Sequence, residues 1–255
     1  MNPKTDEEIK NIRISGQMLA KVLNVIEEQI CEGMTSLDVD VLATSELKKL
    51  GGRPAFKGVP SGNSAQDFPG VICVSVNDAV VHGIPNNIPF KNGDIVGCDF
   101  GVVFNGMITD AARTFIIGNK ARTAREDELV KATKKSLDAG INIIKPGVRT
   151  GDIGAAVQEV LDKHNLGIVR ELVGHGVGHD LHEPPEIPNY GFKGTGHVLK
   201  EGMTIAVEPM ATLGEWRVVM DPDGWTIRTR DGSMSAHFED TLLILKDGVE
   251  ILTRL

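Results

Sequence analysis

The amino-acid sequence predicts an α+β fold made of two related αβ halves. Helical periodicity alternates with β-rich runs along the 255 residues. An Asn-Gly pair between two of those runs indicates an antiparallel hairpin, and short motifs of the first half recur in the second. We therefore expect a single domain over residues 1–255 whose halves span roughly residues 1–120 and 121–255.

Two helices are predicted before the first β-rich run. Thr5 and Glu8 match a capping box, and apolar residues then recur near helical spacing, so the first helix should extend to about Cys31. The second helix should begin near residue 35 or 36 and stop at Gly51-Gly52, because glycine favours helix termination. Its expected apolar positions are Leu37, Val41, Leu42 and Leu47.

The rest of the chain is predicted to alternate between strands and helices. After a loop-rich stretch over residues 53–70, β-rich runs follow at 71–76, 94–104 and 107–117. Two further helices, over roughly 122–144 and 151–164, precede a second β-rich region from about Arg170 to Leu255.

Two weak sequence matches relate the halves. Residues 33–39 align with 147–153, and residues 91–99 align with 200–208. In the second match both segments end in a carboxylate, Asp99 or Glu208, and a very small residue, Gly97 or Ala206, precedes it on the same strand face. Chance similarity is the alternative; we favour two related halves that share one site.

Composition and charge exclude several classes of protein. The net charge of −8 comes from 35 acidic and 27 basic residues, so the chain lacks the basic surface that nucleic acids or anionic membranes require. No apolar run approaches the roughly 20 residues of a membrane span, and the amino terminus lacks a signal-peptide pattern, so we expect a cytoplasmic protein. Cys31, Cys73 and Cys98 form no CxxC pair, which predicts small buried thiols rather than a disulfide framework or a thiolate zinc site.

Asp99 and Asp110 flank the predicted turn Asn105-Gly106. If that pair forms the turn, Asp99 lies opposite Ala112 and is a diagonal neighbour of Asp110 on one face. A solvated strand face is the alternative. However, both runs are rich in apolar and β-branched residues, and carboxylates beside a core repel one another. A divalent cation would relieve that repulsion.

The second half supplies further groups of the same chemical kinds. Glu208 and Glu239 are each embedded in a β run, where a single acid is more often an edge-strand charge than a ligand. The glycine-rich segment 174–185 holds three of the seven histidines. Beside a carboxylate cluster, we favour ligand or acid–base roles for His175 and His182 over structural ones. HExxH, GxSxG and Walker motifs are absent from the sequence.

These residues together resemble the type I methionine aminopeptidases of the pita-bread superfamily. The resemblance covers nearly the whole chain and rests on Asp99, Asp110, His175, Glu208 and Glu239, with Val81-His82-Gly83-Ile84-Pro85, Gly174-His175-Gly176 and Val207-Glu208-Pro209-Met210. It implies a pita-bread fold with a central antiparallel sheet covered by helices. It also implies an enzyme that removes the initiator methionine when the second residue is small.

The resemblance implies two divalent metal ions. Asp99 would bind one ion, Asp110 and Glu239 would bridge both, and His175 and Glu208 would bind the other. Four carboxylates and one imidazole suit Mn, Fe, Co or Zn without selecting among them. Such a pair of ions would activate a water for attack on the first peptide bond.

Further roles carried over from the family concern the substrate. His82 would lie near the peptide bond, His182 would contact the developing oxyanion, and Glu208 would help to move protons. The methionine pocket would be lined by Phe68, Cys73 and Trp225. Leu181 stands where relatives often have an aromatic residue, and the loop 54–70 also departs from the family's pocket-lining stretch, which together predict a wider pocket.

The partners implied are N-terminal methionyl peptides and nascent chains, with a transient ribosome contact and a monomeric enzyme as further expectations. Nucleic-acid specificity and membrane association are not expected. Xaa-Pro peptidases share the ligand set but carry a large extra amino-terminal domain, whereas only about 70 residues precede the first β run here. A non-catalytic binding module would be expected to lose ligands, and this chain keeps all five.

Overall fold

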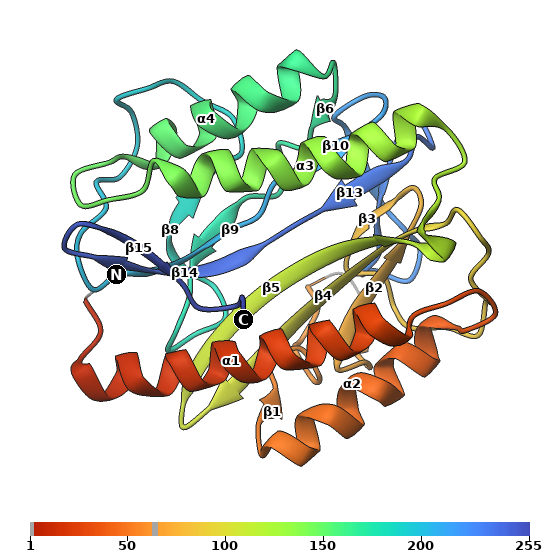
Figure 1. Ribbon diagram of the computed structural model, residues 1–255, viewed down its shortest axis with the longest axis horizontal. Helices are drawn as coiled ribbons and strands as arrows, with labels where there is room; N and C mark the ends of the chain where they lie inside the picture. The colour runs from red at the N-terminus through yellow and green to blue at the C-terminus, as the bar shows by residue number, and fades with distance from the viewer. Residues whose placement is uncertain (1–2, 63–65) are drawn as a thin grey trace.

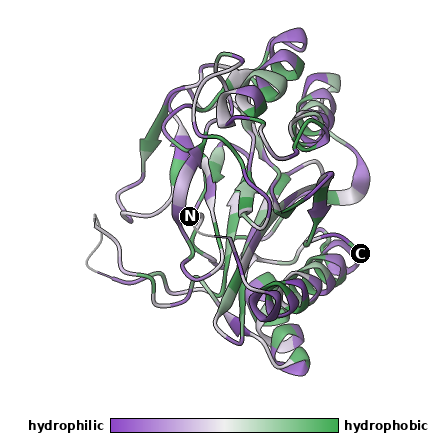
Figure 2. Ribbon diagram, turned by 90° about the vertical axis from the view of Figure 1, so that its left-hand side faces the viewer, coloured by the Kyte–Doolittle hydropathy of each residue, from purple (hydrophilic) through white to green (hydrophobic). Residues whose placement is uncertain are grey.

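Four helices lie along two opposite edges of the strand layer in the computed structural model, which describes residues 3–62 and 66–255 (Figure 1). They are α1 (Asp6–Gln29), α2 (Ser36–Leu50), α3 (Ala124–Asn142) and α4 (Thr150–Lys163). All four gather on one side of the strands (Figure 2). Residues 63–65 of the predicted loop lie outside the described residues. None of the described helices is long and apolar enough to cross a bilayer.

Side-chain caps explain where α1, α2 and α3 begin. Thr5, Thr35 and Thr123 each accept a hydrogen bond from the third residue of the helix that follows, and the acidic side chain there accepts one in return. At the other end of α2, Gly51 adopts the left-handed conformation with φ of 80°. The predicted helices are therefore confirmed to within a few residues at their ends.

The buried face of α2 differs from the predicted one. Val39, Ala43 and Leu47 are buried, whereas Val41 is 67% exposed. Residues four positions apart share a helix face, while Val41 is half a turn away from Val39. The predicted stripe was right for Leu47 and for Leu42, which packs against the core, and wrong for Leu37 and Val41, which lie on the exposed face.

The strands of the first half form one antiparallel sheet and an additional short pairing. They are β1 (Arg53–Pro54), β2 (Ile72–Val76), β3 (Ala79–Val81), β4 (Ile95–Phe104) and β5 (Met107–Ile116). Strands β4 and β5 make the predicted hairpin, with Asn105 and Gly106 both at positive φ, as this turn requires. Asp99 pairs with Ala112, so the predicted register is confirmed. Strand β4 extends over Ile95–Phe104, which confirms the β run predicted for residues 94–104.

The second half contributes ten strands among the described residues. They are β6 (Gly167–Ile168), β7 (Gly174–Gly176), β8 (Glu183–Ile187), β9 (Thr204–Val207), β10 (Met210–Thr212), β11 (Val218–Met220), β12 (Ile227–Thr229), β13 (Ser235–His237), β14 (Asp240–Leu245) and β15 (Gly248–Ile251). The largest sheet has the order β15-β14-β9-β7-β8. Two three-stranded sheets, β13-β10-β6 and β11-β12-β3, complete the layer. The pairs within all of these sheets are antiparallel.

The aligned segments make matching backbone contacts in the two halves. Thr35 bridges Pro89 just before α2, and Arg149 bridges Val198 just before α4. The amides of Gly33 and Gly147 likewise donate to the carbonyls of Phe90 (3.0 Å) and Leu199 (2.9 Å). In each half, the backbone just before a helix, α2 or α4, is therefore hydrogen-bonded to the segment that precedes a central strand, β4 or β9.

Two threonine hydroxyls join β5 of the first half to the strands of the second. Thr241 Oγ1 donates to the carbonyl of Asp110 and accepts from its amide, at 2.7 and 2.9 Å. Thr114 Oγ1 does the same for His237, at 2.6 and 3.0 Å. The two contacts fix the backbone of residues that face the space between the halves.

Each half also has its own apolar core. One buried cluster packs α1 and α2 on β2 and β4, and a second packs α3 and α4 on β9 and β14. Cys73 and Cys98 are buried free thiols, as predicted, but Cys31 is exposed. The prediction for Cys31 was wrong because α1 ends at Gln29 and Cys31 lies in the turn beyond it.

A buried ion pair fastens the start of the chain to the segment after β7. Lys4 Nζ lies 3.1 Å from both carboxylate oxygens of Glu183, and the Lys4 side chain has no exposed surface. Glu183 Oε1 also accepts the amide of His179 at 2.6 Å. The pair therefore joins the segment before α1 to the first residue of β8.

We predict that Lys4→Met lowers the free energy of unfolding by about 3 kcal/mol, because it leaves a largely buried carboxylate without its cation. Lys49→Met is the matched control, since Lys49 pairs with Glu46 at an exposed site and should change stability by less than about 1 kcal/mol. Urea denaturation of the two variants measures both values. Equal effects would show that the Lys4 pair does not fasten the segment.

Candidate functional site

One cavity of about 110 Å³ collects every residue for which the sequence suggested a role. Those residues are Phe68, Cys73, His82, Asp99, Asp110, His175, His182, Glu208, Trp225 and Glu239. Phe56, Val59 and Leu181 complete its lining. The polar residues come from, or directly adjoin, strands of both halves, so the site depends on their association.

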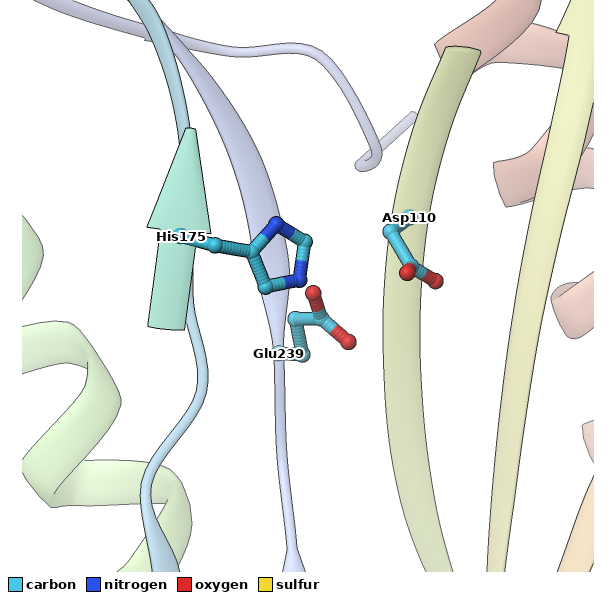
Figure 3. A group of neighbouring side chains, drawn as sticks. All are labelled: Asp110, His175 and Glu239. Carbon is cyan, nitrogen blue, oxygen red and sulfur yellow. The ribbon is translucent and has the colours of Figure 1, made fainter. Parts of the chain in front are cut away.

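Asp110, His175 and Glu239 form the tightest polar group. One ligand atom of each lies within 4.8 Å of the other two, and their side chains point toward a common space (Figure 3). Asp110 projects from β5 and His175 from β7. Glu239 directly precedes β14 and exchanges backbone hydrogen bonds with Ala112, at 3.0 and 3.3 Å. That exchange fixes Glu239 next to β5.

Glu208 and Asp99 extend this group on two sides. Strands β9 and β14 pair Val207 with Asp240. Glu208, which follows Val207, and Glu239, which precedes Asp240, therefore lie just beyond the same end of the paired region. Glu208 Oε1 lies 3.4 Å from His175 Nε2. The pairing of β4 with β5 sets Asp99 opposite Ala112 and diagonal to Asp110, so these two carboxyl groups influence each other's pKa.

Burial and mutual repulsion favour protonation of these four acids. Burial, followed by the charges of Asp110 and Glu208, raises the pKa of Asp99 well above its ordinary value. Burial raises the pKa of Asp110 to about 7, although hydrogen bonds from Asp99 and the Ala111 amide oppose the change. Burial and the charge of Asp110 also raise the pKa values of Glu208 and Glu239.

Two other buried acids, Asp94 and Asp240, have arginine side chains beside them. Asp240, adjacent to Glu239 in sequence, accepts from Arg113 and Arg254 at 2.7 Å each. Within the described residues, by contrast, no lysine or arginine forms an ion pair with any of the four site carboxylates. Oxygens of Asp99, Asp110 and Glu239 are also buried without a hydrogen-bond partner. The chemistry of this group therefore fits a cation from outside the chain.

Divalent metal fits the donor set. Clustered carboxylates with a neutral imidazole are ligands for hard and borderline divalent ions. Burial, then the charge of His182, lowers the pKa of His175 to about 4, so its ring is neutral and able to coordinate. Burial raises the pKa of the Cys73 thiol, so no thiolate competes at neutral pH. The chain thus contains a buried Asp/His/Glu metal-binding cluster.

His82 occupies a strained position at the edge of the same cavity. Its φ of 57° lies in the left-handed region, where the other described non-glycine residues are all asparagines. The backbone after His82 passes so close to β2 that only glycine fits at residue 83. A Cβ on Gly83 would lie 2.3 Å from the carbonyl oxygen of Val74. Strain of this kind concentrates at functional sites. Burial, then the charge of His182, lowers the pKa of His82 to about 4.

His182 directly precedes β8 and lies on the more exposed side of the cavity. Its ring meets that of His175 edge to face, with the ring centres 4.5 Å apart. Burial lowers its pKa, so the imidazole is neutral at neutral pH. The site therefore presents two neutral imidazoles, from His82 and His182, beside the carboxylate group.

The remaining wall of the cavity is apolar. Phe68 and Trp225 pack edge to face with ring centres 5.1 Å apart, and Cys73 and Leu181 belong to the same cluster. Trp225 Nε1 donates to the carbonyl of Gln66 at 3.0 Å, which ties the loop before β2 to the loop before β12. A flexible apolar side chain would find dispersion contacts on this wall.

Three neighbours of the site escaped the sequence analysis. Phe56 and Val59 lie in the loop-rich stretch, which carries no periodic signal. His237 Nε2 lies 3.6 Å from Glu208 Oε2. A signal for His237 did exist, because it stands two residues before Glu239 in a β-rich run.

Comparison with known proteins agrees with this geometry. Residues 10–246 match metallopeptidase family M24. The chain is 41% identical to a methionine aminopeptidase of Clostridium perfringens, over 98% of this chain and 97% of that protein. It is 40% identical to methionine aminopeptidase 1 of Bacillus subtilis, over 98% of each.

Solved structures give the same relationship. A methionine aminopeptidase of Thermotoga maritima superposes with a TM-score of 0.94 at 45% identity and full coverage of both chains. A prolidase of Pyrococcus furiosus superposes with a TM-score of 0.76 at 25% identity, but only 65% of that chain is covered. The predicted pita-bread fold is thereby confirmed.

We predict that Asp110→Asn changes how the stability of the metal-free protein depends on pH. The pKa of Asp110 is raised from 3.8 to about 7 by folding, so the stability that its protonation contributes is present below about pH 4 and is lost as pH rises through about 7. Asparagine cannot ionise, so at about pH 8 the metal-free variant should be more stable than the metal-free parent by about 2–4 kcal/mol. Urea denaturation after chelation, at about pH 4 and pH 8, measures this difference. A variant that is less stable than the parent at about pH 8 would contradict the account.

Proposed function

The chain belongs to the methionine aminopeptidases of metallopeptidase family M24, and we propose that it removes the N-terminal methionine from peptides and nascent proteins when the second residue is small. The observation that carries the proposal is the group of buried carboxylates, with oxygens that have no hydrogen-bond partner, at one end of a small cavity whose other wall is apolar. The carboxylate group suits metal-assisted hydrolysis of an amide, and the apolar wall suits the binding of a single apolar side chain.

We propose that two divalent ions occupy the carboxylate group. Asp99 would bind one, His175 and Glu208 the other, and Asp110 and Glu239 would bridge them. Such ions, when bound, would supply an activated water and polarise the scissile carbonyl. They would also neutralise the repulsion that raises the pKa values of the four acids.

The apolar wall would hold the methionine side chain. Phe68, Cys73 and Trp225 offer soft and aromatic surface to a thioether, and full burial of such a side chain contributes about 1.5–3 kcal/mol. Leu181, which replaces an aromatic residue at that position, leaves the pocket able to accept leucine or norleucine as well.

The two neutral histidines would act at the peptide bond. His82 would hold the peptide near its backbone, where a bulky second side chain would push the carbonyl out of line. His182 would donate a hydrogen bond to the oxygen as it gains negative charge. Glu208, next to both His175 and His237, would take a proton from the attacking water and pass it to the leaving amine.

The finer expectations on partners and place of action belong to the same proposal. We propose that the enzyme acts in the cytoplasm on chains emerging from the ribosome, through a transient contact, and that it is a monomer. We also propose one domain over residues 1–255, with halves of roughly 1–120 and 121–255 joined at the site. The matching backbone contacts at Gly33 and Gly147 support this division.

Peptide hydrolysis by reconstituted protein tests the proposed function. Chelated protein should be inactive and should regain cleavage of Met-Gly-Met, but not of Gly-Pro, when Mn, Fe, Co or Zn is returned. Cleavage of Gly-Pro instead would indicate a dipeptidase of the prolidase kind. Full activity after exhaustive chelation would contradict the metal site, and cleavage of neither peptide would leave only a binding role.

Selectivity for the second residue is predicted to be steric. Peptides beginning Met-Ala, Met-Gly or Met-Ser should have kcat/KM values about 100-fold or more above those beginning Met-Lys, Met-Phe or Met-Leu, since a small misplacement of the carbonyl costs much rate. Leu-Ala and Ala-Ala peptides serve as controls for the first pocket. Similar values across the series would contradict the assigned position of His82, and rapid cleavage of Ala-Ala would contradict the methionine pocket.

His182→Ala should lower kcat by about 100–1000-fold, because one donor to the developing oxyanion is lost. Metal content should stay at the parental value, since the proposed role of His182 does not include coordination. Steady-state kinetics and elemental analysis measure the two quantities on one preparation. Loss of an ion from the variant would instead make His182 a ligand.

A further inference from the structure

We propose that His237 is a positioning residue that orients the Glu208 carboxylate, through the oxygen that His175 does not contact. The inference rests on the proposed metal site, because Glu208 is one of its ligands there. Nothing in the sequence resemblance assigns a role to His237, and it lies in none of the motifs on which that resemblance depends.

The starting observation is an unpartnered nitrogen. His237 is only 3% exposed, and its Nε2 has no hydrogen-bond partner. A buried polar atom without a partner is destabilising, so such atoms are rare in folded proteins unless a function retains them. The nearest ionisable oxygen is Glu208 Oε2, 3.6 Å away.

Glu208 therefore has one imidazole beside each oxygen. His175 Nε2 lies 3.4 Å from Oε1, and His237 Nε2 lies 3.6 Å from Oε2. A ring nitrogen that faces a carboxylate is favoured as N–H, since two lone pairs would repel. A small rotation of the Glu208 side chain would close the gap to a hydrogen bond. The His237 N–H would then hold the carboxylate in one orientation, as groups behind metal ligands commonly do.

The backbone around His237 is held rigidly enough for that task. Thr114 Oγ1 bonds both its carbonyl and its amide, and strand pairing places it opposite Met210, two residues beyond Glu208. The imidazole and the carboxylate are thus fixed relative to each other by adjacent strands. A precise position is the property that an orienting residue needs.

Comparison of the two halves explains why an imidazole is suited to this position. Thr241 holds the backbone of Asp110 just as Thr114 holds that of His237. The residue whose backbone the threonine bonds is Asp110, beside Asp99, in the first half. In the second half it is His237, beside Glu208. A fifth acid there would add to the repulsion among the other four. Histidine instead supplies a donor.

Three variants test the proposal: His237→Gln, which keeps an N–H donor, His237→Leu, which removes it, and Phe238→Leu as a control. Phe238 is buried in the second core, so its truncation should lower stability without touching Glu208. Isothermal titration of each metal-free protein with Mn²⁺ gives ion affinity and stoichiometry. Steady-state kinetics with Met-Gly-Met give kcat and KM, and thermal unfolding gives the Tm.

For His237→Leu we expect ion affinity and kcat to fall by about 10–100-fold, with two ions still bound at saturation and KM within about threefold of the parent. His237→Gln should recover most of both losses. Phe238→Leu should lower the Tm while leaving affinity and kcat within about threefold.

Three results would overturn the assignment. His237→Leu could keep parental affinity and kcat, His237→Gln could be as impaired as His237→Leu, or both could lose one ion per chain, which would make His237 a ligand. If the parent protein cleaves no methionyl peptide, the proposed function fails, but the Mn²⁺ titrations still decide the role of His237.

Discussion

Repulsion among clustered carboxylates is the constraint on which the rest of this structure depends. Asp110, Glu208 and Glu239 are buried together beside Asp99, and the described residues offer these four acids no lysine or arginine. Arginines nonetheless reach Asp240, the neighbour of Glu239. A fold that neutralises a structural acid and leaves adjacent acids unneutralised is arranged to receive cations. Without them, folding must retain protons on the carboxyl groups or lose stability as pH rises.

The two halves bring these acids together without relying on a long loop. Hairpin β4–β5 carries Asp99 and Asp110, and β9 and β14 place Glu208 and Glu239 at the ends of a paired region. Threonine hydroxyls and the backbone bonds of Glu239 join the halves at that point. Because each half has its own core, strand packing rather than the ligands themselves sets the positions of the site residues.

The sequence was most informative where local rules determine structure. The capping box of Thr5 and Glu8, the Asn105-Gly106 turn and the register that follows from it could be predicted from spacing alone. The family resemblance supplied the remaining members of the site, which come from distant segments. The buried face of α2 and the exposure of Cys31 could not be read so well, since both depend on which surface a tertiary neighbour covers. His237 was missed although it stands two residues before Glu239 in a β-rich run, because tertiary packing is what places its unpartnered nitrogen next to Glu208.

The central claim is that cations the chain itself does not supply complete the carboxylate group. Anomalous diffraction from crystals of the protein grown with Mn²⁺ tests it most directly, because the ions are located independently of any assay. The account predicts two anomalous peaks within coordination distance of Asp99, Asp110, His175, Glu208 and Glu239, with the two bridging acids in contact with both. Crystals that hold Mn²⁺ elsewhere, or that leave this group without a peak at saturating metal, would contradict it.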